Sequence, residues 1–473
     1  LGDDTLVAPG TFQNPDIWLA MFDPAGAPVW ARRFGGDEHD TGQKILLLPN
    51  GDIYLMGQFG GTVQLGDTVI YAPDSIGPIC GGFVARLDPN GEPIRAQVFS
   101  LASHSMNGGD MAVDPFGNVH VLAGFDTDGS LNIEVQKWDP DGQLIWQAPL
   151  PAQIDNARLA LTPDGHVLVV GGTTVVGSWL REFDANGQLV LLKEYPTTLA
   201  GALKLNDVAS DAQGRPIITG MLINSFVVEG SSHSSAGYSD PFIMKLNAAD
   251  SVQWYTQGGG PGAMLAETES GSGVVVNASG DVFAAVSGNG WVTYGGITVQ
   301  GDDGVDGQET YLLKLDSMGF VQGVLGSGYQ TLRDFPLSVE LGTNDHLFIG
   351  GSLMTTDQPG PTFGGTSVIG LTALQNWDLY VAEVGDLSTA IHAPGEDRTA
   401  PMIFPNPASG EITITRLPAQ GQLHLRDAQG RSIRSVHITG TEMHWTVADL
   451  PAGYYQIELQ GRSERSVTRL IKL

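Results

Sequence analysis

Apolar and polar residues alternate along short segments of this chain, and the same kind of segment recurs. Each segment is about eight residues long, and most end in Asp or Asn. Alternation with a period of two is typical of a β-strand that buries one face. The sequence therefore predicts seven related strands, at residues 16–23, 81–88, 132–139, 177–184, 240–247, 309–316 and 378–385.

Most of these segments run into a tight turn that begins with Asp and ends with Gly, as at residues 23–26 and 88–91. The Asp side chain can accept hydrogen bonds from the backbone ahead of it, and Gly tolerates the positive φ that ends such a turn. Another strand is expected after each turn, and in three copies it carries Trp30, Trp146 or Trp254. We therefore expect a β-hairpin that repeats along the chain.

A second kind of strand precedes these hairpins and is led by Gly or Asp. Six clear copies and a weaker one cover residues 51–59, 117–125, 165–172, 214–221, 280–287, 345–352 and, more weakly, 4–12. A short apolar stretch, such as residues 44–48, lies upstream of most copies. The expected unit thus has four strands: a short inner strand, the Gly-led strand, the Asp-ended strand and the Trp-bearing strand.

Four antiparallel strands repeated six or seven times describe an all-β fold, the β-propeller, whose radial packing leaves only short sheet edges. The first unit lacks its inner strand, and the last stops at Gly385. Two arrangements fit: seven blades, two of them three-stranded, or six full blades, the last closed by an N-terminal strand. We favour seven. The pattern over roughly residues 1–385 resembles the bacterial seven-bladed propeller repeats (SBBP-like) of many exported proteins, so we expect a propeller domain at residues 1–386.

Residues 387–400 break the alternation and contain Pro, Gly and mixed charge, which is typical of a linker. Short strands separated by turn residues are expected in residues 401–473, and this pattern favours a small immunoglobulin-like β-sandwich. A series of motifs marks this segment in order: Pro405-Asn406-Pro407, Asp427 with Gly430-Arg431, Leu450-Pro451-Ala452-Gly453 with Tyr455, and Lys472 near the end. Together they resemble the type A C-terminal sorting domain of the type IX secretion system.

This resemblance implies a route and partners for the protein. A signal peptide, already absent from this chain, takes it across the inner membrane, and the type IX translocon takes it across the outer membrane. The tail docks on the shuttle protein of the translocon, and a surface sortase typically removes it, so we expect the cut within residues 387–400. Such systems belong to Bacteroidota, and their cargo is secreted or held at the outer cell surface.

Composition supports a folded, exported protein. Of its 473 residues 41% are hydrophobic and 16% charged, so a packed core is expected. The net charge is −29, and because residues 401–473 hold eight basic and six acidic residues, the rest carries −31. This acidity excludes nucleic acid and anionic lipid as partners. No apolar run reaches the roughly 18 residues of a membrane-spanning helix, and Cys80 is the only cysteine, so no internal disulfide forms.

Candidate binding residues are few. Asp302, Asp303 and Asp306 cluster in one loop and are the best cation candidate, with calcium as the expected ion; no other cofactor is expected. Trp291, in the loop-like stretch 288–296, is the preferred exposed aromatic for stacking on a glycan. The other strand tryptophans are expected to pack between repeats.

No catalytic motif stands out. The sequence lacks a G-x-S-x-G elbow and any paired histidine motif for zinc. We therefore expect no enzymatic activity and favour a propeller that binds a glycan or a protein, in recognition or adhesion. Two alternatives stay open: a secreted polysaccharide hydrolase or lyase acting at the propeller face, and a structural component of the cell surface.

Overall fold

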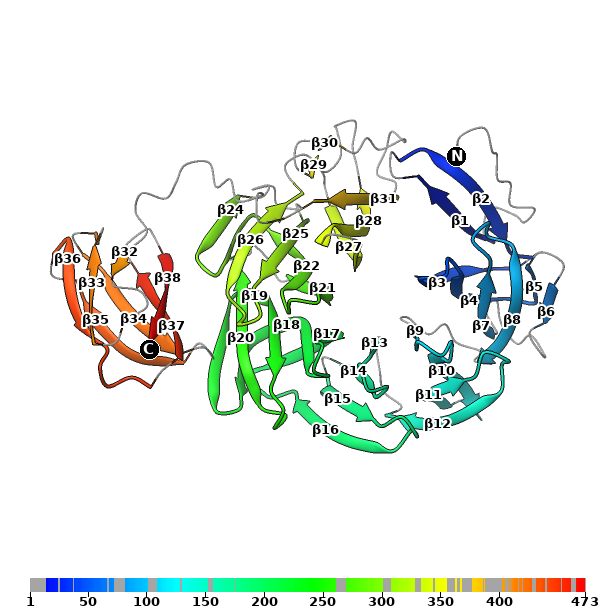
Figure 1. The fold of residues 1–473 in the computed structure, drawn as a ribbon, viewed down its shortest axis with the longest axis horizontal. Coiled ribbons are helices and arrows are strands. Elements are labelled where there is room, and N and C mark those ends of the chain that lie inside the picture. The colour runs from blue at the N-terminus through cyan, green and yellow to red at the C-terminus, as the bar shows by residue number, and fades with distance from the viewer. Residues whose placement is uncertain are drawn as a thin grey trace. The chain divides into compact units, whose positions relative to one another are not determined.

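The structure, a computed structural model, consists of β-strands joined by turns (Figure 1), with no α-helix among the residues that it describes. Described are residues 14–472, with main gaps at 72–80, 101–108, 261–268, 301–307, 355–361, 368–376 and 388–401, and shorter gaps of one to five residues. This part of the chain accordingly offers no helix with the length and apolarity needed to cross a bilayer. The all-β prediction is confirmed.

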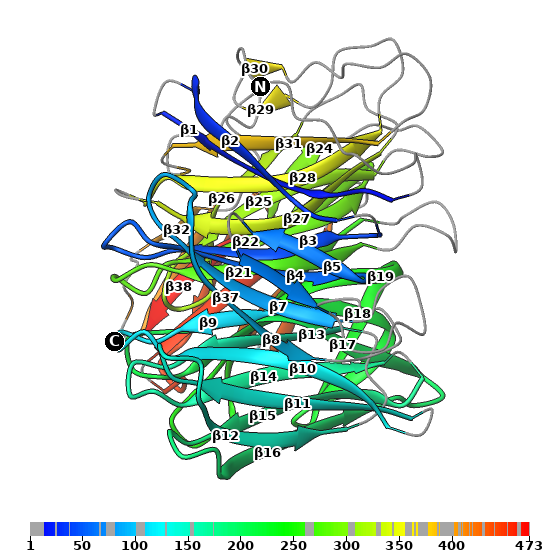
Figure 2. The ribbon, with the colours of Figure 1, turned by 90° about the vertical axis from the view of Figure 1, so that its right-hand side faces the viewer.

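The chain divides into two compact units, residues 1–173 with 179–193 and residues 174–178 with 194–473. The first unit contains a hairpin, β1(Ile17–Phe22) with β2(Pro28–Phe34), and two four-stranded antiparallel sheets. One sheet has the order β3(Thr41–Leu47), β4(Ile53–Phe59), β7(Gly81–Leu87), β8(Pro93–Ser100), and the other β9(Met111–Val113), β10(Val119–Thr127), β11(Ser130–Trp138), β12(Leu144–Leu150). These two sheets are neighbours (Figure 2), and β8 contacts β10.

A further four-stranded sheet contributes residues to both units, in the order β13(Asn156–Leu161), β14(Val167–Thr173), β15(Gly177–Phe183), β16(Leu189–Pro196). Two larger sheets belong to the second unit. The first has the order β17(Gly201–Ser210), β18(Pro216–Val228), β19(Ser231–Leu246), β20(Val252–Gly259), β23(Trp291–Tyr294), β24(Ile297–Gln300). The second has the order β21(Ser270–Val276), β22(Val282–Asn289), β25(Gln308–Leu315), β27(Arg333–Leu341), β28(Leu347–Met354), β31(Trp377–Val384), with β26(Val321–Gly326) paired to β25.

These strands follow the predicted order of inner, Gly-led, Asp-ended and Trp-type strand. Five groups have all four strands, beginning at β3, β9, β13, β17 and β21. In the last group β31 is the final strand among the described residues, as expected from the sequence. The first shows only β1 and β2, and the Gly-led strand expected at residues 4–12 lies outside the described residues.

The turns have the expected chemistry. In the turn between β7 and β8, the Gly91 N–H donates to the Asp88 carbonyl at 2.9 Å, and Gly91 has a φ of 76°. The Asp88 carboxylate accepts from the backbone N–H groups of Asn90 and Glu92 at 2.8 and 2.9 Å. Because a residue with a Cβ is strained at such a φ, the sequence needs Gly there.

An extra hairpin that the sequence analysis did not predict lies between the Gly-led and Asp-ended strands of three groups. These hairpins are β5(Thr62–Leu65) with β6(Thr68–Tyr71), β23 with β24, and β29(Thr362–Phe363) with β30(Thr366–Ser367). In the group that begins at β17, the two long strands β18 and β19 extend to occupy this place.

The apolar core lies between successive sheets, because both faces of the inner strands are buried. In β4, Ile53 and Leu55 pack into a core shared with the β1–β2 hairpin. The alternate residues Tyr54 and Met56 pack into a second core shared with β10, which includes Val121. The sheet that contains β4 is thereby held by both of its neighbours.

Residues 402–472 form two sheets around a core of their own (Figure 1). One has the order β32(Met402–Phe404), β33(Glu411–Thr415), β36(Glu442–Thr446), and the other β35(Ser432–His437), β34(Gln422–Asp427), β37(Gly453–Gln460), β38(Arg465–Lys472). Ile412, Leu423, Trp445 and Ile457 belong to the core between them.

Candidate functional site

In the Asp427–Arg431 motif of the C-terminal segment, hydrogen bonds join the end of β34 to the start of β35. The Arg431 N–H donates to the Asp427 carboxylate at 2.9 Å, and the Arg431 Nε donates to the same group at 2.6 Å. The Asp427 N–H donates in turn to the Arg431 carbonyl at 3.0 Å. The spacing between Asp427 and Arg431 thus specifies a turn with both ends fixed, while Gly430 lies outside the described residues.

The motif from Leu450 to Tyr455 fixes the entry into β37. Leu450 is buried, and its N–H donates to the Val447 carbonyl at 3.1 Å. The Tyr455 hydroxyl donates to the Pro451 carbonyl at 2.9 Å. A tyrosine that binds the backbone a few residues upstream holds a strand corner in place, which explains the Leu-Pro-x-Gly-x-Tyr pattern.

The remaining motif residues are placed only in part. Lys472 is buried at the end of β38, where it pairs with Gly453. Pro405, Asn406 and Pro407 lie outside the described residues. The structure therefore brings Leu450, Pro451, Gly453, Tyr455 and Lys472 to one end of the β37–β38 hairpin.

Of the predicted ligand residues, only Trp291 lies in a described segment. Trp291 begins β23 and is paired with Gln300, so the expected loop at residues 288–296 is wrong. Asp302, Asp303 and Asp306 lie outside the described residues. Within the described ranges no three His, Cys, Asp or Glu side chains are grouped as metal ligands would be.

Two pairs of buried carboxylates were missed by the sequence analysis. Glu269 and Asp240 are both buried, and burial raises the pKa of Glu269 to about 8, although Gly260 and Asn289 donate N–H groups to it. A Cβ on Gly259 would lie 2.9 Å from the Asp240 carboxylate.

The second pair, Asp16 and Asp40, has the same arrangement in the first group. Burial raises the pKa of Asp40 to about 7, and the Gly36 N–H donates to it at 2.8 Å. A Cβ on Gly35 would lie 2.9 Å from the Asp40 carboxylate. In both places a Gly-Gly pair after the Trp-type strand allows the backbone to approach the carboxylates, so we interpret them as joints of the repeat.

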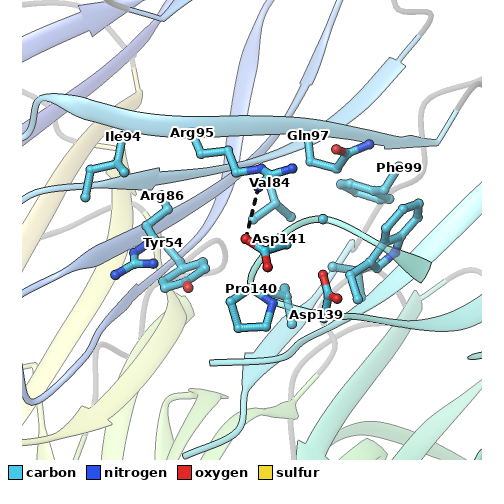
Figure 3. A pocket seen from close by; sticks show the side chains of 14 residues that line it. Tyr54, Val84, Arg86, Ile94, Arg95, Gln97, Phe99, Asp139, Pro140 and Asp141 are labelled. Atoms are coloured by element: carbon cyan, nitrogen blue, oxygen red, sulfur yellow. Dashed lines mark ion pairs between the residues drawn. The ribbon is translucent and has the colours of Figure 1, made fainter. Parts of the chain in front are cut away.

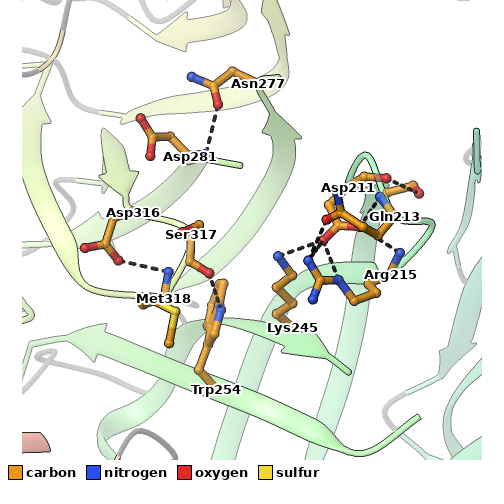
Figure 4. A network of polar contacts seen from close by, with 11 residues as sticks. Asp211, Gln213, Arg215, Lys245, Trp254, Asn277, Asp281, Asp316, Ser317 and Met318 are labelled. Atoms are coloured by element: carbon orange, nitrogen blue, oxygen red, sulfur yellow. Dashed lines mark hydrogen bonds and ion pairs between the residues drawn. The ribbon is translucent and has the colours of Figure 1, made fainter. Parts of the chain in front are cut away.

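Tryptophan–turn contacts join successive strand groups at three places: Trp30 with Gly91, Trp146 with Gly187, and Trp254 with Gly319. In each, the indole N–H donates to a carbonyl of the turn, at 3.2 Å to Pro89, 3.0 Å to Ala185 and 3.2 Å to Ser317. The ring lies where a Cβ on the turn glycine would be. Figure 4 shows the contact of Trp254 with the turn at Ser317.

A pair of ionisable side chains joins the Asp-ended strand to the turn before the Gly-led strand in each of six groups, those that begin at β3, β9, β13, β17, β21 and β27. Lys245 and Asp211 form the most buried pair, at 2.8 Å, with each side chain only 2% exposed (Figure 4). In two groups the residue types are exchanged: the strand carries Glu and the turn carries His, and the contact is an ion pair only when the histidine is protonated. The pairs are Arg86–Asp52, Lys137–Asp114, Lys245–Asp211 and Lys314–Asp281, and, exchanged, Glu182–His166 and Glu383–His346.

A cavity of about 440 Å³ opens between the sheet β3–β4–β7–β8 and the sheet β9–β12 (Figure 3). Its apolar walls include Val84, Phe99 and Val121, and Arg95 and Asp141 lie next to each other at its edge. We call it the Arg95 cavity. Its size lies within the range of about 300–1,000 Å³ that is usual for small-molecule sites.

The C-terminal segment decides what kind of protein this is. Its closed turn, its tyrosine corner and its two-sheet core are accompanied by a match of residues 402–473 to the family of secretion system C-terminal sorting domains. Residues 402–473 are a C-terminal sorting domain. Such a domain indicates cargo of the type IX secretion machinery, so the protein is secreted or lies on the outer cell surface. The predicted resemblance is confirmed for this segment.

No curated protein is similar to the chain in sequence. Similar solved structures include a protein of unknown function from Bacteroides caccae, with 12% identity and a TM-score of 0.34 over 65% of this chain and 92% of that one. Another is a PL25 ulvan lyase, with 13% identity and a TM-score of 0.38 over 68% of this chain and 78% of that one.

A third is PorZ, a bacterial surface component of the type IX secretion system of Porphyromonas gingivalis, with 12% identity and a TM-score of 0.22 over 95% of this chain and 77% of that one. At these identities and TM-scores, the likeness assigns no activity to this chain.

Proposed function

We propose that this protein is type IX cargo whose repeat domain, residues 1–386, is a seven-bladed β-propeller that binds a glycan or a protein outside the cell without catalysis. The sorting domain at residues 402–473 carries this proposal, because it defines where the protein works. Residues 401–473 then form the tail, an immunoglobulin-like sandwich that the shuttle protein of the translocon recognises, and residues 387–400 form the linker at which the tail is removed.

Two features support a binding role for the repeat domain. Successive four-stranded groups with shared cores give a rigid scaffold, on which loops and junctions can carry recognition. The buried carboxylates with raised pKa values sit against glycine backbone in the joints of the repeat, which favours a structural use over acid–base catalysis.

Export is tested in a bacterium with a working type IX system. The chain lacking residues 401–473 should remain in the periplasm. A fluorescent protein with a signal peptide and residues 387–473 fused to its C-terminus should reach the outside, whereas the same reporter without the tail should not. This second arm is independent of whether the truncated chain folds. Export of the truncated chain, together with retention of the tailed reporter, would show that the tail is not a sorting signal.

Binding is tested with the full chain on a glycan array, followed by chromatography of the incubated glycan. Retention without a change in glycan length supports the proposal. Shortened products would make the protein an enzyme, and a silent array would leave a protein partner or a structural role.

A further inference from the structure

The tryptophan–turn contacts fill the junctions at which they occur. Trp146 faces Lys137 across the β11–β12 ladder, and Trp254 faces Lys245 across the β19–β20 ladder. The tryptophan position is thus fixed by register: it is the residue on the Trp-type strand that pairs with the next-to-last residue of the Asp-ended strand, as Trp30 pairs with Met21 of β1.

Arg95 occupies this position in β8. It faces Arg86 across the β7–β8 ladder, and it follows Pro93 by two residues as Trp30 follows Pro28. The next turn keeps its glycine, Gly142, where a Cβ would lie 2.9 Å from an Arg95 guanidinium nitrogen. The flexible side chain of Arg95, with its hydrated guanidinium group, therefore lies where three other junctions have a flat indole ring.

This exchange accounts for the Arg95 cavity. The turn glycine leaves room for a ring that is absent, so the core between the two sheets is open at this end. Tyr54, Phe99 and Trp138 supply aromatic surface to the cavity, and Val119 and Val121 supply aliphatic surface.

The two arginines that line the cavity differ in the strength of their ion pairs. The Arg86 Nε donates to Asp52 at 2.9 Å, so its charge is neutralised within its own group. Arg95 is 43% exposed, and it lies 3.8 Å from Asp141, whose side chain is 91% exposed (Figure 3). An exposed pair at this distance contributes little to stability, so a ligand anion can replace Asp141 at the guanidinium without loss of a strong contact.

We propose that the Arg95 cavity binds one acidic sugar residue of a glycan, a pyranose ring that carries a carboxylate or sulfate group. The C–H face of the ring packs on the aromatic side chains, and the acidic group takes the planar guanidinium of Arg95, which suits such oxyanions. Asp139, Asp141 and Gln97 accept hydrogen bonds from the hydroxyl groups. This assignment rests on the proposed function, because it requires the cavity to meet glycans outside the cell.

The test is calorimetric titration of the full chain with digalacturonate, galactose 6-sulfate and neutral galactobiose. The first two probes distinguish a carboxylate ligand from a sulfate ligand. Four proteins are compared: the natural chain, Arg95→Gln, Arg95→Trp and the control Arg32→Gln. The control removes a partly exposed arginine of β2 that pairs with Glu92 outside the cavity.

We expect the natural chain and Arg32→Gln to bind at least one acidic probe about tenfold more tightly than galactobiose, the scale of one charge-assisted hydrogen bond. Arg95→Gln should lose this preference. Arg95→Trp should lose all binding while its melting temperature stays equal or rises, because a fourth tryptophan–turn contact forms.

Equal binding of the acidic and neutral probes, no binding of any acidic probe, or full binding by Arg95→Trp would each overturn the assignment. The glycan array separates this failure from failure of the proposed function: an array signal that persists in Arg95→Trp places recognition elsewhere on the repeat domain.

Discussion

From the buried ion pair between Lys245 and Asp211 we predict that loss of the aspartate destabilises the fold more than loss of the lysine. The Asp211 carboxylate accepts from Lys245, from the Arg215 Nε at 2.7 Å and from the backbone N–H groups of Gln213 and Arg215, both at 2.9 Å. Lys245 is 2% exposed and relies on Asp211 for its counter-charge. Removing the carboxylate therefore leaves a buried ammonium, whereas removing the ammonium leaves a carboxylate that still has Arg215.

The substitution Asp211→Asn should lower the opening free energy of this sheet by about 3–5 kcal/mol, the usual cost of an unpaired buried charge. Lys245→Met should lower it by only about 1.5–2 kcal/mol, the scale of one lost hydrogen bond to a charged group. Because the double variant carries no buried ammonium, it should be more stable than Asp211→Asn alone.

Hydrogen exchange of the amides in β18 and β19, followed by mass spectrometry, measures this opening locally. Amides in β33 and β36 of the sorting domain serve as the internal control and should not change. Equal losses in the two single variants, or a double variant whose loss equals their sum, would refute the argument that Asp211 has a second cation and Lys245 does not.

Two further predictions concern the joints and the turns. The folded-state pKa of Glu269, about 8, lies above the ordinary value of 4.5 for this side chain, so the folded state holds a proton that the unfolded state releases between these values. The contribution of this group to the free energy of unfolding should be complete below about pH 4.5 and should be lost as the pH rises through about 8. In urea titrations at pH 5 and 8.5, Glu269→Gln should therefore reduce the dependence of stability on pH. An unchanged dependence would contradict the prediction. Gly319→Ala should cost more than Gly165→Ala, which adds a methyl group at a similar φ with no atom within 4 Å. The control should lose about 1–2 kcal/mol from backbone strain, and Gly319→Ala at least about 1 kcal/mol more, because its methyl group displaces Trp254; equal losses in thermal unfolding would show that the ring does not rest on the turn.

Strand types and turns could be predicted from the sequence because their causes are local. Alternation identifies a strand such as β11, and an Asp followed three residues later by Gly identifies the turn after it. The hairpin β5–β6 was missed because strands of four residues are too short for alternation to be read. A search for Gly-Gly after each Trp-type strand could have pointed to the carboxylate joints, but the partners Asp240 and Glu269 are 29 residues apart and meet only through folding.

The Arg95 cavity was missed for a different reason. Nothing in the segment around Arg95 distinguishes it from other arginines until the Trp-type strands are aligned by register. The alignment then shows Arg95 at the position that Trp30, Trp146 and Trp254 hold in their strands, and only the structure shows that a cavity with aromatic walls lies there. The sorting domain, in contrast, could be predicted because its motifs follow one another in a characteristic order along the chain.

The ion pairs with exchanged charges have a consequence for assembly of the array. Chains built from similar modules can misassemble by inserting a strand into the wrong neighbour. If β15, which carries Glu182, took the place of β11, two carboxylates would meet at Asp114; if β11 took the place of β15, Lys137 would meet His166 instead of a carboxylate partner. The Glu–His pairs of the fourth and the last strand groups therefore disfavour exchange of their Asp-ended strands with those of the other groups, which helps each strand to join its own sheet.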